Sequence, residues 1–309
     1  QPMTSQGTTP ICDYEDSQYQ TEFWEHGNRE YEDRVERIAL KYLLPKSGSR
    51  CLEVGAGAGR LTRELDAFDN IVVLDYSITQ LQQAQSRLGR EARYTYVAAD
   101  AYNLPFVSGV FDAALMVRVI HHLTEAQSVL SSIHNTLRPN GTLILEFANK
   151  RNLKAIIRYF LRLQNWNPFN TETVEYNQLN YNFHPKTITR WLNNSGFVVG
   201  QKRSVSHFRW HILKRIIPTD VLVTVDSLLQ FTGPLWQLTP SIMLSANAND
   251  TGPTAESNTL FQCTICSSNN LEHSSNYLTC PNCGRICVIK DGIYDFKKLH
   301  QGKGANNNE

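Results

Sequence analysis

Three glycines at alternate positions, Gly55, Gly57 and Gly59, stand between a short apolar run and a segment that can open a helix. Side chains there would keep the backbone away from a ligand, so such a loop is typical of a nucleotide-like cofactor site. Glu53 argues against a bound phosphate, because the negative charges would repel, and it suits a ligand with a cationic end. Asp75 ends a second apolar run, where a carboxylate can accept both hydroxyls of a ribose. The pattern predicts a site for a nucleoside-containing cofactor.

Further motifs follow this loop in order along the chain, at residues 72–77, 97–106, 111–123 and 137–146. Together with the acidic residue and the Gly-x-Gly-x-Gly loop, they resemble the class I S-adenosylmethionine-dependent methyltransferases. The resemblance implies a methyltransferase with S-adenosylmethionine as its cofactor. The alternative is a Rossmann-like domain that binds no nucleotide.

The same resemblance assigns individual cofactor contacts. It places Glu53 near the amino-acid end of S-adenosylmethionine, with the three glycines lining the loop. It gives Asp75 the ribose hydroxyls, Asp100 the adenine amino group and Ala101 a backbone contact to the ring. It lets Tyr76 pack on the adenine face. The alternatives are an ordinary loop aromatic for Tyr76 and a helix cap for Asp100.

Two groups of residues are candidates for proton transfer, because histidine titrates near neutral pH. Arg118, His121 and His122 follow the fourth strand, on the expected rim of the cofactor site. Arg118 could contact the cofactor carboxylate or an anionic substrate, and His122 could instead cap the following helix. His184, next to Pro185, is the second candidate base. Its alternative role is a helix-entry turn.

Four cysteines form two Cys-x-x-Cys pairs, Cys263 with Cys266 and Cys280 with Cys283. Two intervening residues let one turn present both sulfurs to a tetrahedral metal, and four thiolates suit a closed structural zinc site. A rubredoxin-type iron centre is the alternative. Cys287 has the wrong spacing for this site. We therefore expect zinc to hold together a small domain with too little core to fold alone.

Residues 283–296 resemble the small zinc-ribbon activators that partner tRNA and rRNA methyltransferases. The shared features are a cysteine-glycine knuckle and an Ile-x-Asp-Gly-Ile strand, here Ile289, Asp291, Gly292 and Ile293. Two positions depart from the family, Cys287-Val288 in place of Tyr-Pro and Tyr294 in place of a proline. The resemblance implies an RNA or protein partner that binds through the ribbon.

Strand and helix patterns alternate through the first part of the chain, which predicts an α/β fold with a doubly wound, Rossmann-like parallel sheet. Strands are expected near 51–54, 71–75, 94–98, 111–117 and 142–148, and helices near 30–43, 59–67, 78–88, 125–137 and 186–195. A strand at 197–206 and a helical, one-sidedly apolar region at 207–239 follow. The segment 241–246 is expected to be the last strand, antiparallel by the methyltransferase resemblance.

The composition shifts along the chain divide it into five parts. They are a flexible segment at 1–28, the methyltransferase domain at 29–247, a linker at 248–259, the zinc ribbon at 260–298 and a disordered tail at 299–309. The linker and tail are polar and lack an apolar period.

Overall composition is that of an ordinary globular protein, with 41% hydrophobic and 19% charged residues and a net charge of +1. No general field draws the protein to nucleic acid. No apolar run reaches the ~18 residues of a membrane span. Seven cysteines, an odd number with four in metal-like pairs, favour a reducing cytoplasm over a disulfide framework.

Two basic stretches, 150–162 and 202–215, each carry five cations and no acid, with apolar and aromatic residues between them. They predict a surface for RNA, for an anionic lipid-like substrate or for a membrane. The alternative is a solvated helix face. The segment after the fourth strand lacks the Asn/Asp-Pro-Pro-Tyr and Pro-Cys patterns, which excludes adenine-N6 and cytosine-C5 methylation. We favour a small or lipid-like acceptor. A tRNA, rRNA or translation-factor methyltransferase and a non-catalytic scaffold with a docking ribbon are the alternatives.

Overall fold

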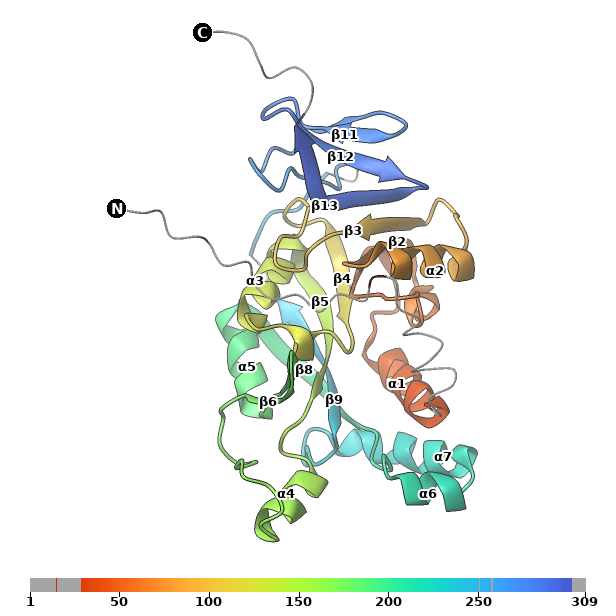
Figure 1. Cartoon of the computed structure of the whole chain (residues 1–309), viewed down its shortest axis with the longest axis vertical. Helices are drawn as coiled ribbons and strands as arrows, with labels where there is room; N and C mark the ends of the chain where they lie inside the picture. The colour runs from red at the N-terminus through yellow and green to blue at the C-terminus, as the bar shows by residue number, and fades with distance from the viewer. Residues whose placement is uncertain (1–14, 16–28, 250, 257, 302–309) are drawn as a thin grey trace, which may run out of the picture.

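One sheet of eleven strands runs through this computed structural model, which describes residues 15, 29–249, 251–256 and 258–301 (Figure 1). Its strand order is β10-β11-β12-β13-β3-β2-β1-β4-β5-β9-β8. The methyltransferase-like part consists of β1 (Gly48–Val54), β2 (Phe68–Asp75), β3 (Tyr94–Ala98), β4 (Phe111–Met116), β5 (Leu137–Ala148), β8 (Phe197–Val205) and β9 (Ser241–Ala248). The predictions for 1–28 and for 302–309 lie outside the described residues, Glu15 apart.

The five strands from β3 to β5 are parallel, and β9 lies antiparallel between β5 and β8. Their apolar runs are continuous because helices cover both faces. Helices α1 (Glu30–Leu43), α2 (Ile78–Leu88) and α7 (Thr219–Leu229) contribute to one core, and α3 (Ala126–Thr136) and α5 (Pro185–Asn194) to the other. The doubly wound sheet and its antiparallel last strand are confirmed.

The predicted helix at 59–67 is wrong. This segment forms turns and a short 3-10 helix, η2 (Thr62–Leu65). Gly59 has φ +72°, in the left-handed region, and a side chain there would lie 2.8 Å from Leu88 Cδ1. Since β2 already begins at Phe68, too few residues remain for a full helix.

The region 207–239, expected to be helical, contains α6 (His211–Ile216), α7 and the short 3-10 helix η4 (Gln230–Thr232). Other short elements escaped the sequence patterns: α4 (Leu153–Phe160), η3 (Ile120–His122) and the hairpin of β6 (Val174–Asn177) and β7 (Asn180–Asn182). Asn152 caps α4, because its side chain accepts a hydrogen bond from the Ala155 amide at 2.9 Å. No described helix has the length and apolarity needed to cross a bilayer.

The cysteine-rich segment folds as β10 (Glu272–His273), β11 (Tyr277–Thr279), β12 (Arg285–Lys290) and β13 (Ile293–Gln301). Strand β13 pairs in parallel with β3, so the ribbon continues the methyltransferase sheet (Figure 1). It thereby covers an edge that would otherwise expose unpaired backbone groups. The strand extends to Gln301, three residues beyond the expected end of this domain.

The described part of the expected linker packs on the large domain. The Ala255 amide donates to the Gly109 carbonyl at 2.9 Å. Next to it, the Val107 amide donates to Leu260 at 3.1 Å, and the rings of Phe106 and Phe261 stack at 5.9 Å. These contacts tie the ribbon to the sheet at a second place.

Candidate active site and metal centre

A cavity opens at the carboxyl ends of β1, β2 and β4, where parallel sheets place their ligands. Most of the cofactor-binding residues predicted from the sequence line it together: Glu53, Gly55, Gly57, Asp75, Tyr76, Asp100, Ala101 and Arg118. His122 lines it as well. Gly59 does not. It packs the loop against Leu88, which is a supporting role.

The glycine loop and Asp75 hold each other in place. Gly55 and Gly57 have φ of +67° and +54°, and a side chain on Gly55 would lie 2.2 Å from Val119. The Gly57 amide donates to Asp75 Oδ2 at 2.8 Å, and the Ser77 amide donates to Oδ1 at 2.9 Å. Each carboxylate oxygen can accept more than one hydrogen bond. Asp75 is therefore oriented and can still accept a pair of hydroxyls from the cavity.

Glu53 is a buried carboxyl on the wall of this cavity. Burial raises its pKa to about 7, and the charge of Asp75 also raises it, against a hydrogen bond from Thr62 and the charge of Arg60. The Thr62 hydroxyl donates to Glu53 Oε2 at 2.6 Å. A carboxyl with a pKa near neutrality responds strongly to an incoming cation, which would favour its charged form.

Asp100 closes a turn. Its Oδ1 accepts a hydrogen bond from the Tyr102 amide at 2.9 Å, which fixes the carboxylate at the cavity wall. Tyr76 lies beneath a residue of the ribbon, because Lys297 Nζ is 4.8 Å from its ring centroid. Lys297 also lies 3.6 Å from Glu15, whose carboxylate accepts hydrogen bonds from the first amides of α2. The ribbon thus reaches the rim of the cofactor cavity.

Arg118 joins α1 to the site. Its guanidinium binds the buried Glu36 at 2.5 and 2.9 Å, and Arg60 binds the other oxygen of Glu36 at 2.8 Å. Burial would raise the pKa of Glu36, but the two guanidinium groups outweigh it and lower that pKa. Arg118 has φ +60°, an unfavourable backbone conformation for this residue type that here turns the chain at the cavity rim.

A second cavity, of about 220 Å³, shares Arg118 with the first. Its other lining residues include His121, Glu146, Tyr181 and Arg209. The His121 Nδ1 atom is buried and has no hydrogen-bond partner among the described residues. Burial, together with His122 and Arg118, holds the pKa of His121 well below its usual value, so the ring is neutral.

Glu146, on β5, escaped the sequence analysis as a site residue. It accepts hydrogen bonds from the Ser241 hydroxyl and, at 3.0 Å, from the Arg118 amide, and burial raises its pKa. The available signal was an acid inside the apolar run from Leu143 to Phe147. Burying a carboxyl group there costs free energy unless its oxygens have hydrogen-bond partners.

The other two histidines have different surroundings. His122 Nδ1 lies 2.9 Å from the Leu179 carbonyl, which assigns the proton to that nitrogen and leaves Nε2 as an acceptor. His184 caps α5, where its Nδ1 accepts from the Lys186 amide at 3.2 Å. His184 lines a third, open hollow and neither of the two cavities around Arg118.

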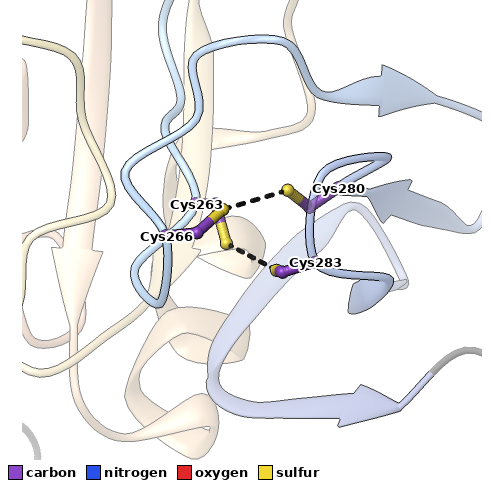
Figure 2. A group of neighbouring side chains, drawn as sticks. All are labelled: Cys263, Cys266, Cys280 and Cys283. Atoms are coloured by element: carbon purple, nitrogen blue, oxygen red, sulfur yellow. Dashed lines mark hydrogen bonds between the residues drawn. The ribbon is translucent and has the colours of Figure 1, made fainter. Parts of the chain in front are cut away.

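The four paired cysteines converge as predicted (Figure 2). All four sulfur atoms lie within 4.8 Å of one another, with Cys263 3.6 Å from Cys283 and Cys266 3.5 Å from Cys280. Zinc–sulfur bonds of about 2.3 Å in a tetrahedron place sulfurs about 3.8 Å apart, so this donor set fits zinc. Cys287 lies apart, with its thiol directed to the Asp295 carbonyl at 3.3 Å.

The fold and the cavity define a class. Parallel strands carry a glycine loop at the end of β1 and an acid at the end of β2, which is the site that the resemblance to S-adenosylmethionine-dependent methyltransferases predicts. Residues 52–145 match the family model described as a methyltransferase domain. The chain therefore contains an S-adenosylmethionine-dependent methyltransferase domain, and the corresponding prediction is confirmed.

Known proteins similar to this chain include quinone-pathway enzymes. A demethylmenaquinone methyltransferase of Clavibacter sepedonicus is 26% identical over 56% of this chain and 76% of its own length. A 2-phytyl-1,4-naphtoquinone methyltransferase of Nostoc sp. is 28% identical over 42% of this chain, but the match spans 58% of that enzyme.

Among solved structures, the complex between the Haloferax volcanii Trm112 methyltransferase activator and a methyltransferase contains a similar chain. The TM-score is 0.54 at 14% identity, over 75% of this chain and 96% of that one. At this identity the likeness establishes the fold alone.

Proposed function

We propose that this protein transfers a methyl group from S-adenosylmethionine to a small or lipid-like acceptor. Two adjoining cavities that share Arg118 carry this proposal. The first has the glycine loop and the oriented Asp75, and the second has a neutral histidine and a buried carboxyl. When bound, S-adenosylmethionine supplies an activated methyl group with a good leaving group, so the protein mainly aligns the reactants and excludes water.

The cofactor contacts follow the cavity wall. Asp75 accepts the ribose hydroxyls, Glu53 faces the cationic amino-acid end, and Asp100 with Ala101 receives the adenine. Tyr76, held under Lys297, packs on the adenine ring. The carboxylates on the wall accept hydrogen bonds and carry negative charge. They therefore fit a cofactor that has hydroxyls, an amine and a positive charge.

The acceptor binds in the second cavity, with its polar head toward His121 and Glu146. The His121 Nδ1 atom, which has no hydrogen-bond partner within the described part of the chain, belongs to a neutral ring. It can take a proton from an acceptor hydroxyl or ring carbon as the methyl group is transferred. His122, which lines the cofactor cavity, is the second candidate base. His184 is the third and the least favoured, because it lines neither cavity. The names of two similar enzymes, both quinone-pathway methyltransferases, support an acceptor with a polar ring and a lipid tail.

A methyl-transfer screen tests this proposal. Labelled S-adenosylmethionine is incubated with the protein and with separate lipid, small-molecule and RNA fractions, and with reduced naphthoquinones. We expect label in the lipid or small-molecule pool. Label in tRNA or rRNA alone would promote the translation-related function. Tight cofactor binding by calorimetry without transfer to any pool would favour the non-catalytic scaffold.

The RNA alternative has one specific observation in its favour. The ribbon that resembles activators of tRNA and rRNA methyltransferases shares a sheet with the methyltransferase domain through β13 and β3. Under this alternative the ribbon binds RNA or a protein partner. The salt dependence of binding distinguishes RNA from a lipid, because binding to phosphates releases counterions and weakens steeply with salt.

We also propose that the four cysteines hold one structural zinc ion, in a reducing cytoplasm where the thiols persist. A closed set of four sulfurs leaves no open position for a substrate, so the metal stabilises the ribbon. Elemental analysis of freshly purified protein should find one zinc per chain. A metal-free protein that zinc does not change would contradict this.

A further inference from the structure

A hollow of about 520 Å³ lies beside α5, away from both cavities around Arg118. Four cationic side chains line it: Arg151, Lys186, Arg190 and Lys202. No acidic residue lines it, and none of the four forms an ion pair with a described residue. They come from three separate segments of the chain, namely the turn before α4, helix α5 and strand β8.

Arg151 and Lys202 belong to the two basic stretches, 150–162 and 202–215. Other cations of these stretches have partners inside the protein. Lys150 is buried and donates to Asn170 and to the Glu172 carbonyl. Arg203 stacks on the Phe231 ring at 3.9 Å, and Lys214 binds Glu32 at 3.0 Å. The fold therefore satisfies several cations inside the protein and still gathers four others around one hollow. Such a concentration of like charge is unfavourable unless an anion occupies it.

The local field agrees with this interpretation. His184, at the positive end of α5, also lines the hollow. Burial first, and then the charges of Arg151, Lys150 and Lys186, lower the pKa of its ring. The positive end of the helix adds to the attraction of an anion.

The rim of the hollow is apolar and exposed. Leu235 lines it with 82% of its surface accessible, and Trp236 beside it is 64% exposed. This loop is joined to α4, because the Leu153 amide donates to the Leu238 carbonyl at 2.8 Å. Large exposed side chains continue from there along α4 and beyond it: Leu153, Ile157, Phe160, Leu161 and Leu163.

Cations accompany this apolar surface. Lys154, Arg158 and Arg162 lie in and just after α4, in a stretch without an acid. Helices α4 and α6 both lie at the end of the molecule opposite the ribbon (Figure 1). Helix α6 adds the exposed Ile212 and Ile216 there. An apolar surface with cations around it is the pattern of a helix that lies in a membrane interface.

We propose that this end docks on an anionic bilayer, with the phosphate of a phospholipid head in the hollow of Arg151, Lys186, Arg190 and Lys202. The apolar rim enters the acyl boundary. A second copy of the chain is a poorer occupant, because it would bring two acid-free cationic surfaces together. RNA would leave Leu235, Trp236 and Phe160 without apolar contacts. The proposal does not depend on which molecule accepts the methyl group.

Cosedimentation of the full, zinc-replete chain with vesicles tests it, without S-adenosylmethionine. We expect binding to phosphatidylcholine vesicles that contain phosphatidylglycerol and little binding to phosphatidylcholine alone. Arg190→Glu and Lys186→Glu should each weaken binding about tenfold or more, since each reversal removes one attraction and adds a repulsion. Leu235→Ser should weaken it through the apolar rim.

Matched controls lie elsewhere on the surface. Lys290→Glu reverses an exposed charge in the ribbon, and Val198→Ser removes an exposed apolar side chain on β8. Both should leave vesicle binding unchanged. Circular dichroism of every variant checks that it is folded.

Five outcomes would overturn the proposal. The first four are equal binding to both kinds of vesicle, loss of binding in the control variants, tight RNA binding that vesicles cannot displace, and dimerisation that Leu235→Ser abolishes. Binding of inorganic phosphate in the hollow without vesicle binding would assign the site to a free phosphate and also exclude the membrane. Methyl transfer is measured separately, so failure here and failure of the proposed function are distinguishable.

Discussion

The cofactor cavity and the basic hollow beside α5 differ in how well the sequence predicts which residues line them. Around Glu53, Asp75 and Asp100, each candidate stands at the end of a strand, and parallel pairing brings these ends to one edge of the sheet. Around Arg151 and Lys202, neighbours in sequence point to different places. Lys150 is internal, whereas Arg151 lines the hollow. A sequence motif therefore predicts which side chains share a site where a sheet fixes their direction. A run of charged residues does not.

The largest effect is expected in the zinc ribbon, because the fold of the ribbon depends on its metal. Cys280→Ser should unfold residues 260–301, since metal binding supplies most of the folding free energy of such a unit, on the order of 10 kcal/mol. Strand β13 would leave β3, and amides of β3 should lose protection in hydrogen exchange. Cys287→Ala, outside the sulfur cluster, should keep one zinc per chain. Full protection of β13 in a zinc-free protein would refute this.

The second cavity should respond next. His121→Ala should lower kcat about 10²- to 10⁴-fold, the range for loss of a positioned base, with little change in cofactor affinity. His184→Ala should change kcat far less, because His184 lines neither cavity. Steady-state kinetics with the acceptor found in the screen measures both. Equal losses in the two variants would remove the base assignment.

The cofactor end should be sensitive at Asp75. Asp75→Ala should weaken S-adenosylmethionine binding about a hundredfold, since two hydrogen bonds to a charged acceptor are lost. Asp69→Ala, an exposed acid on the same strand, is the matched control and should bind normally. Calorimetric titration reports both affinities. Unchanged affinity in a folded Asp75→Ala protein would remove this residue from the site.

The smallest expected effect is a pH dependence at Glu53. Its pKa of about 7 means that it is largely protonated below neutrality in the free protein. A cationic cofactor favours the carboxylate and lowers that pKa, so affinity should rise as pH increases up to about 7 and level off above it. The slope is at most tenfold per pH unit for one proton. Glu53→Gln should flatten the profile, and an unchanged slope would assign it to another group.

Much of the fold and of the cofactor site could be predicted because the signals are local. The helix at 30–43, the parallel strands and the four converging cysteines follow from short patterns of apolarity and spacing. The antiparallel direction of β9 is implied only by the resemblance to methyltransferases. The helix expected at 59–67 failed, because the left-handed Gly59 and the early start of β2 are consequences of packing.

The sequence by itself determined which chemistry the chain carries: a glycine loop with two acids, and a set of four thiols. Only the tertiary structure decided which side chains share a cavity. Glu146 meets His121 because β5 lies next to β4, and Arg190 meets Lys202 because α5 packs beside β8. It also decided that β13 pairs with β3 and carries Lys297 to Tyr76. The physical reason is that local patterns set the elements, whereas burial and backbone pairing between distant segments set their neighbours.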